Sequence, residues 1–116
     1  MENKQGGAGQ GGLNPAEATD LNGLVDYAAG AIVSKTIVKN GVGNVTLFSF
    51  DKGQGLSEHT APFDALVQIV DGAAEITIGG KAVHAEAGSL VLMPAGIPHA
   101  LQAETRFKMM LVMIRG

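Results

Sequence analysis

Residues 65–104 read ALVQIVDGAAEITIGGKAVHAEAGSLVLMPAGIPHALQAE. Short runs of aliphatic and β-branched residues alternate here with turn-forming groups, namely Asp71-Gly72, Gly79-Gly80, Ala87-Gly88 and Pro94-Ala95-Gly96. Glycine adopts the backbone angles that tight turns need, and proline fixes the entry into a turn. The stretch therefore predicts short strands at 65–70, 73–78, 81–86, 89–93 and 99–104.

The same pattern continues on both sides of this stretch. Two runs rich in β-branched residues, AIVSKTIVK (31–39) and NVTLFSF (44–50), flank a glycine-containing turn at 40–43, and RFKMMLVMI (106–114) is a further strand candidate. Short strands at such regular spacing, with almost no helix, predict an all-β sandwich or closed barrel.

The residues before the first strand fall into two parts. Residues 1–12 are rich in glycine and glutamine, and we expect a mobile tail there. Asn14-Pro15-Ala16-Glu17 has the composition of a helix start, and Leu21, Leu24 and Val25 follow at helical spacing. The sequence thus predicts one short N-terminal helix lying on a single domain that spans residues 13–116.

Composition excludes several function classes. The chain has 116 residues, 46% apolar and 16% charged, with a net charge of −3 and no cysteine. An acidic balance argues against nucleic acid or an anionic membrane as a partner, and the lack of cysteine excludes disulfides and a thiol nucleophile. The first residues lack the apolar run of a secretory signal, and no run of 18 apolar residues occurs, so we expect a cytoplasmic protein.

Both faces of the last predicted strand are apolar. Phe107, Met109, Leu111 and Met113 alternate with Met110, Val112 and Ile114. One face fills a core, so the other must meet a second layer of the same chain or another subunit. We therefore expect a homodimer, with a second sheet of the same chain as the alternative.

The Gly79-Gly80 turn fixes the register of the hairpin around it. A two-residue turn pairs Ile78 with Lys81 and, three residues further along each strand, Glu75 with His84. Ile76, Ile78 and Val83 share the buried face, so His84 is predicted to form a surface charge pair with Glu75 rather than to bind a ligand.

Two spacings in this chain resemble those of the cupin superfamily. Gly53, His59 and Gly72 fall at the positions of the first cupin motif, while Gly88, Pro94, Gly96 and His99 reproduce the second. The resemblance covers about residues 31–114. It implies a single-domain cupin jelly roll, also called a double-stranded β-helix, with its active pocket inside the barrel.

The resemblance also implies four metal-ligand positions, three histidines and one carboxylate. His59 and His99 occupy two of them, Ala61 and Ala65 occupy the other two, and Ala103 replaces the asparagine that ends the second motif. Open iron and zinc sites use three protein ligands. We therefore expect a degenerate site at His59 and His99 for a divalent transition metal (zinc, nickel, iron or manganese).

Three hypotheses for the function remain, and whether the protein is an enzyme stays open. Alanine at positions 61 and 65 leaves an apolar cavity, and Phe50 and Met109 would be soft walls if they face inward. The first hypothesis is therefore a pocket for a small organic ligand, lined by His59, Ala61, Ala65, His99, Phe50 and Met109.

The other two hypotheses assign catalysis to the histidines. In a metal-free isomerase or epimerase, Asp64 or Glu58 would tune one imidazole as an acid or base. In a metal-dependent dioxygenase, lyase or isomerase, a third ligand is required. Gln68 or His84 serves only if the predicted strand faces are wrong, and Asp64 only if a bulge turns it inward.

Overall fold

The computed structural model describes residues 13–115 and is built almost entirely of antiparallel strands. The strands are β1 (Ile32–Asn40), β2 (Gly43–Phe50), β3 (Gly55–His59), β4 (Asp64–Ile78), β5 (Lys81–Glu86), β6 (Leu90–Met93), β7 (His99–Gln102) and β8 (Phe107–Ile114). The predicted all-β class is confirmed. Among the described residues, the structure contains no helix with the length and apolarity that a bilayer crossing requires.

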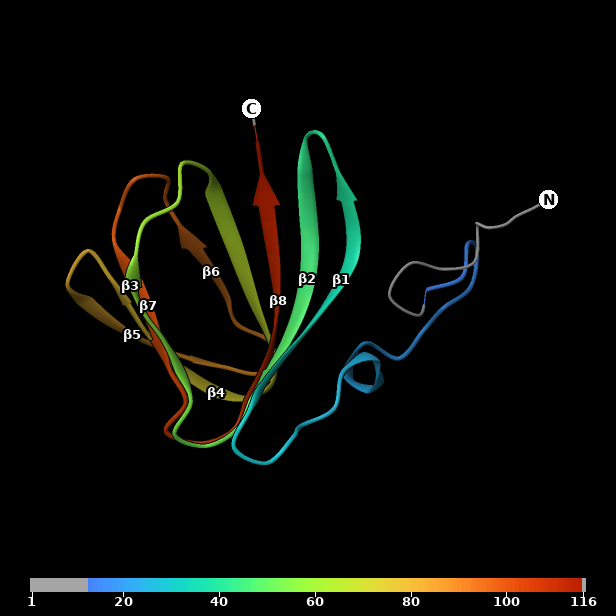
Figure 1. The fold of residues 1–116 in the computed structure, drawn as a ribbon, viewed down its shortest axis with the longest axis horizontal. Coiled ribbons are helices and arrows are strands. Elements are labelled where there is room, and N and C mark those ends of the chain that lie inside the picture. Colours follow the sequence, from blue (N-terminus) through green and yellow to red (C-terminus); the bar gives the residue numbers. More distant parts are fainter. Residues whose placement is uncertain (1–12, 116) are drawn as a thin grey trace.

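The strands form two sheets that curl around a common interior (Figure 1). A first sheet has the order β1-β2-β8-β4-β6, and a second sheet has the order β3-β7-β4-β5. The turn between β1 and β2, the β3–β4 loop and the β6–β7 loop lie at the upper end of the barrel in Figure 1. This arrangement is the jelly roll that the resemblance implied.

Strand β4 belongs to both sheets. Its first half pairs with β6 and β8, and its second half pairs with β5 and β7. The prediction that a turn at Asp71-Gly72 separates two strands is wrong. The chain bends there without leaving the sheet, because the β4–β8 register shifts between Ile69 and Asp71 and Gly72 has a positive φ of 73°.

The structure confirms the hairpin register and adds a strand that the sequence pattern did not reveal. Across the Gly79-Gly80 turn, Ile78 pairs with Lys81 and Glu75 pairs with His84. The additional strand is β3, which carries no alternation of apolar and polar residues. It forms because β7 offers it backbone partners, with Gly55 opposite Gln102.

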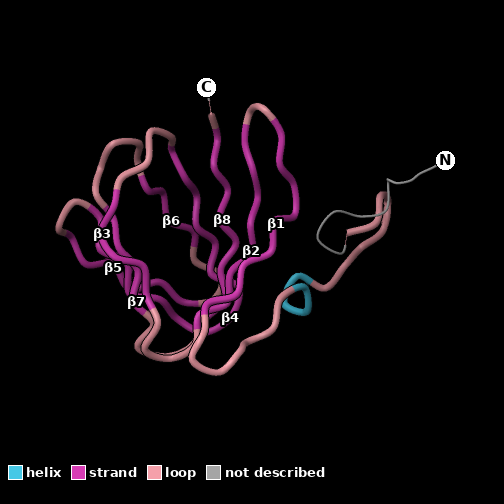
Figure 2. The backbone as a smooth tube through the Cα atoms, viewed as in Figure 1, coloured by secondary structure: helices cyan, strands magenta, loops and turns pink. Residues whose placement is uncertain are grey.

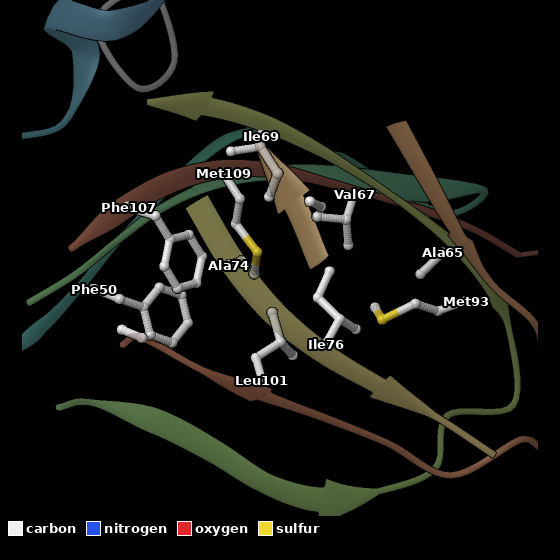
Figure 3. Packing of buried hydrophobic residues seen from close by; sticks show 12 residues of the cluster. Phe50, Ala65, Val67, Ile69, Ala74, Ile76, Met93, Leu101, Phe107 and Met109 are labelled. Carbon is white, nitrogen blue, oxygen red and sulfur yellow. The ribbon is translucent and has the colours of Figure 1, made fainter. Parts of the chain in front are cut away.

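The core lies between the two sheets and is filled from both (Figure 3). Phe50 of β2 and Phe107 of β8 stack with ring centroids 4.5 Å apart and an angle of 9° between the rings. Val67, Ile69 and Ile76 of β4 complete the centre, each almost fully buried. The stacking of these two buried aromatic rings stabilises the fold beyond the burial of their apolar surface.

The predicted short N-terminal helix is present as a 3₁₀ turn, but its expected start at Asn14 is wrong, and most of the segment around it is extended. Residues 14–17 form a tight turn, in which Glu17 N–H donates to Asn14 O (3.3 Å) and Ala16 has a φ of 63°. The described part contains one short 3₁₀ turn, η2 (Leu21–Leu24), drawn in cyan in Figure 2. The predicted tail, residues 1–12, lies outside the described residues.

Side chains of the first sheet hold this segment, which we call the arm (residues 13–28), against the outer face of the sheet. Lys108 Nζ donates to Asn22 O (2.7 Å), Lys35 Nζ to Leu24 O (3.0 Å) and Ser49 Oγ to Asp26 O (2.8 Å). Asn22 and Leu24 belong to the 3₁₀ turn η2, and Asp26 follows it. The side chains thus satisfy carbonyls that a helix would have paired internally.

Tyr27 fastens the end of the arm. Its hydroxyl donates to Asp71 Oδ2 (2.6 Å), and the Arg106 guanidinium lies 4.4 Å from its ring centroid. Partial burial, together with the hydrogen bond to Asp71, raises the pKa of the Tyr27 hydroxyl. The arm therefore ends at the bend of β4, where Asp71 is located.

Replacing Gly72 by alanine tests the bend in β4. An added Cβ would overlap the Arg106 carbonyl oxygen, and the positive φ adds backbone strain. We expect Gly72→Ala to lower the free energy of unfolding by about 2–3 kcal/mol in urea denaturation. Gly96→Ala is the matched control, because Gly96 has a φ of 75° with open space around it. Gly96→Ala should lower the free energy of unfolding by only about 1 kcal/mol. Equal losses in the two variants would show that the close contact between residue 72 and the Arg106 carbonyl oxygen does not add to the cost.

Candidate functional site

His59 and His99 meet at the upper end of the barrel. They lie directly opposite each other, His59 at the end of β3 and His99 at the start of β7. Their ring centroids are 4.4 Å apart, with an edge-to-face angle of 67°. His99 is buried and shares the inward face of β7 with Leu101, whereas His59 is exposed. The structure thus brings together the two histidines that the sequence singled out.

Backbone carbonyls fix the orientation of both imidazoles. His59 Nδ1 lies 2.8 Å from Ser57 O, and His99 Nδ1 lies 3.2 Å from Ile97 O. A carbonyl oxygen only accepts hydrogen bonds, so Nδ1 carries the proton in each neutral ring. The lone pair of each ring is therefore on Nε2, where it can accept a hydrogen bond or bind a metal.

The loops beside the histidines are joined by backbone and side-chain hydrogen bonds. Gly96 N–H donates to Ala61 O, and Ala95 N–H donates to Asp64 Oδ1, both at 2.8 Å. The Asp64 carboxylate is thus engaged by the β6–β7 loop. The register irregularity of β4 lies near Ile69, so no bulge turns Asp64 onto the face of Ala65.

Methionines flank the position at which the family resemblance implied a carboxylate. Ala65 on β4 pairs with Met93 on β6 and with Met113 on β8. Ala65 and Met93 are both buried in the core, as Figure 3 shows. This wall of the interior is therefore apolar and polarisable, and it carries no charge.

Phe50 and Met109 face the interior, as the prediction of a ligand pocket requires. Both are fully buried members of the main core cluster, as Figure 3 shows. Ala103 is also fully buried. The assignment of these residues, with Ala61 and Ala65, to a ligand pocket stays a prediction.

The described residues do not fit a metal centre with three or more protein ligands. No group of three His, Cys, Asp or Glu side chains within residues 13–115 is placed to hold a metal ion. Gln68 pairs with Leu90 and Met110 on the outer face of the first sheet, and His84 pairs with Glu75 on the outer face of the second. Neither supplies the third ligand beside His59 and His99.

Comparison with known proteins identifies the family. The family model described as "Cupin domain" matches residues 46–115. The chain belongs to the cupin family. Among curated proteins, none matches this cupin.

Solved structures of similar cupins cover nearly the whole chain. A conserved protein of unknown function from Streptococcus pyogenes is 39% identical, with a TM-score of 0.85 over 90% of this chain and 91% of that one. A cupin superfamily protein from Desulfitobacterium hafniense is 25% identical, with a TM-score of 0.84 over 90% and 95% of the two chains. A cupin barrel protein from Leptotrichia buccalis is 40% identical, with a TM-score of 0.81 over 84% of this chain and 47% of that one.

A shallow hollow on the outside of this cupin was not predicted from the sequence. It has a volume of about 380 Å³ and lies over the second sheet, lined by Ser57, Glu75, Thr77, Ala100 and Gln102 among others. Buried and more exposed side chains alternate along β4 and β7. This alternation places Glu75, Thr77 and Gln102 on the outer face of the sheet, whereas His99 faces inward. The hollow is therefore separate from the histidine pair.

His84 forms the predicted surface charge pair with Glu75. Its Nδ1 donates to Glu75 Oε2, and its Nε2 lies 3.6 Å from Glu86 Oε2. The hydrogen bond to Glu75, with the charge of that carboxylate, raises the pKa of His84. A raised pKa in the folded state means that protonated His84 stabilises the fold.

The pH dependence of stability tests this pair. The contribution of His84 is complete below the ordinary histidine pKa and is lost as the pH rises through the raised value. We therefore expect Glu75→Gln to lower the urea midpoint at about pH 6 and to leave it unchanged at about pH 9. Glu58→Gln removes an exposed carboxylate of β3 and is the control. The same loss at both pH values would show that the His84 charge is not involved.

Proposed function

We propose that this cupin binds a small organic molecule at the upper end of its barrel, with His59 and His99 as its polar contacts. The observation that carries the proposal is the shared orientation of the two imidazoles, each with Nδ1 at a backbone carbonyl oxygen. Two Nε2 lone pairs are thereby offered by rings whose centroids are 4.4 Å apart. This pair accepts hydrogen bonds from a ligand that carries a hydroxyl or another N–H or O–H group.

The remaining surroundings favour a ligand that is otherwise apolar. Ala65, Met93 and Met113 form a row of neighbours on the inner face of the first sheet, next to the loop that contains Ala61. Methionine side chains adapt to irregular apolar shapes. A small phenol or aliphatic alcohol has the required combination of one polar group and an apolar body.

A metal-dependent reaction is the second candidate. A histidine that binds a metal through one ring nitrogen commonly donates the other N–H to a backbone carbonyl, and both histidines have that arrangement. Zinc, nickel, iron or manganese held by only two imidazoles would need ligand or solvent atoms to complete its coordination. The two-ligand set therefore favours the binding of an organic molecule over a resident metal.

Metal-free acid–base catalysis is less well supported by the contacts. A carboxylate beside a histidine ring nitrogen would raise its basicity. At His59 and His99, however, the Nδ1 atoms face the carbonyls of Ser57 and Ile97, and Asp64 accepts a hydrogen bond from Ala95. The geometry thus favours binding over proton transfer.

Titration with phenol, and with toluene as the matched apolar probe, tests the proposed binding. We expect phenol to shift the Nε2 resonances of His59 and His99 in ¹⁵N NMR and toluene to shift them much less. His59→Ala and His99→Ala should each weaken phenol binding by about three- to tenfold, the effect of one lost hydrogen bond. His84→Ala removes the outward-facing histidine and should bind phenol like the parent. Equal phenol binding by all variants would contradict the proposal.

Metal analysis of the protein purified without a histidine tag separates the first two candidates. For an organic-ligand site, we expect far less than one metal ion per chain, because two imidazoles bind metals weakly. His59→Ala, His99→Ala and the control His84→Ala are measured beside the parent. Near-stoichiometric metal that is lost in the first two variants and kept in the third would replace the first candidate by the metal-dependent one.

A further inference from the structure

The loop between β6 and β7 leads directly to His99, the first residue of β7. It reads Pro94-Ala95-Gly96-Ile97-Pro98, and residues 95–98 are exposed, so burial does not fix its position. The two prolines have no N–H group, which leaves three N–H groups in the loop. The hydrogen bonds of these three groups therefore decide how the loop is held.

One of the three N–H groups closes a tight turn within the loop. Ile97 N–H donates to Pro94 O (3.3 Å). Gly96 has a φ of 75°, the positive value that the third residue of a type II turn requires. The N–H groups of Ala95 and Gly96 take no part in closing this turn and are free to donate elsewhere.

Both of these donors reach the segment that follows β3. Ala95 N–H donates to Asp64 Oδ1 and Gly96 N–H to Ala61 O, both at 2.8 Å, and we call these two contacts the latch. The Ala61 contact uses a main-chain carbonyl, which any residue would offer. Asp64 supplies the side-chain part of the latch, a hydrogen bond that the charge of the carboxylate strengthens.

The carbonyl that orients His99 belongs to the last residue of the latched turn. Ile97 O lies 3.2 Å from His99 Nδ1. The peptide unit between Ile97 and Pro98 has no N–H, so strand pairing does not hold it, and the first carbonyl bound outside the loop is Pro98 O, which accepts Gly79 N–H (2.8 Å). The direction of the Ile97 carbonyl therefore depends on the turn before it.

His59 does not depend on the latch in this way. The carbonyl at its Nδ1 belongs to Ser57, which lies within β3 and not in a loop. The two imidazoles thus have the same orientation for different reasons. One is set by a strand, and the other by a turn that Asp64 holds.

We propose that Asp64 is a positioning residue for His99. Through the latch it holds the β6–β7 turn, and the turn directs the Ile97 carbonyl to His99 Nδ1, which keeps Nε2 unprotonated and free for the ligand. This role rests on the proposed binding of an organic molecule at the histidine pair. Asp64 does not touch that molecule, because its neighbour Ala65 takes the inner face of β4.

¹⁵N NMR of the imidazoles in the ligand-free protein tests the positioning. At about pH 9, above the ordinary histidine pKa, the Nδ1 and Nε2 resonances report which nitrogen carries the proton. We expect Asp64→Ala to move the Nε2 resonance of His99 toward the protonated position, because the Ile97 carbonyl no longer keeps the proton on Nδ1. Asp64→Asn retains an oxygen acceptor and should leave this resonance as in the parent.

His59 is the internal control, and Asp51→Ala is the matched control variant. Asp51 also accepts a loop N–H, from Gly30 (2.6 Å), but it directly follows β2, at the end of that strand away from the β1–β2 turn. We expect the His59 resonances to stay unchanged in Asp64→Ala and the His99 resonances in Asp51→Ala. An unchanged His99 tautomer in Asp64→Ala, or an equal change at His59, would overturn the proposal. Asp64 is exposed, so its replacement should leave the fold intact, which circular dichroism checks.

Phenol binding shows whether Asp64 acts through His99. We expect Asp64→Ala to weaken phenol binding by about two- to fivefold. In the His99→Ala protein the same substitution should have no further effect, since a residue that acts through a side chain has no influence once that side chain is gone. An equal loss in both backgrounds would show that Asp64 acts independently of His99 and would overturn the proposal. A parent protein that does not bind phenol would contradict the proposed function, and the His99 tautomer would still decide the role of Asp64.

Discussion

The bend of β4 at Gly72 is the constraint on which the two-sheet structure depends. One strand takes part in both sheets, with Val67 and Ile69 before the bend and Ile76 after it, and all three side chains point into one core. The bend requires a positive φ and a close approach to the Arg106 carbonyl, and glycine alone meets both conditions without strain. Because the bend lets β4 pair in both sheets, the two sheets enclose one core around the Phe50–Phe107 stack.

The histidine pair depends on the closure of the second sheet. His59 has few local determinants, since β3 is short and mostly exposed, and its position is set by its pairing with His99 on β7. Backbone carbonyls then orient both rings. Two Nε2 lone pairs beside an alanine- and methionine-lined wall are the basis of the proposed binding of a mostly apolar ligand with one polar group. A third metal ligand beside them is missing from the described residues.

The outer face of the first sheet is apolar beyond the arm because the outward residues of β8 that follow Lys108, namely Met110, Val112 and Ile114, are all apolar. The arm shields part of that face, and it is held by side-chain donors from β1, β2 and β8 rather than by strand pairing. The part beyond the arm keeps its aliphatic side chains exposed.

The sequence by itself determined the all-β class, most strand positions and the Glu75–His84 pair, and it singled out His59 and His99, which the structure brings together. Alternation, turn residues and motif spacing are local features, and they act over a few neighbouring residues. Tertiary structure decided that β4 is continuous through Gly72, that β3 is a strand and that the arm is extended. It also placed Gln68 on the outer face of the first sheet and bound the Asp64 carboxylate to the Ala95 N–H of the β6–β7 loop. These outcomes depend on partners distant in the chain: the Arg106 carbonyl beside Gly72, β7 beside β3, and Lys108 beneath the arm, none of which a local pattern can contain.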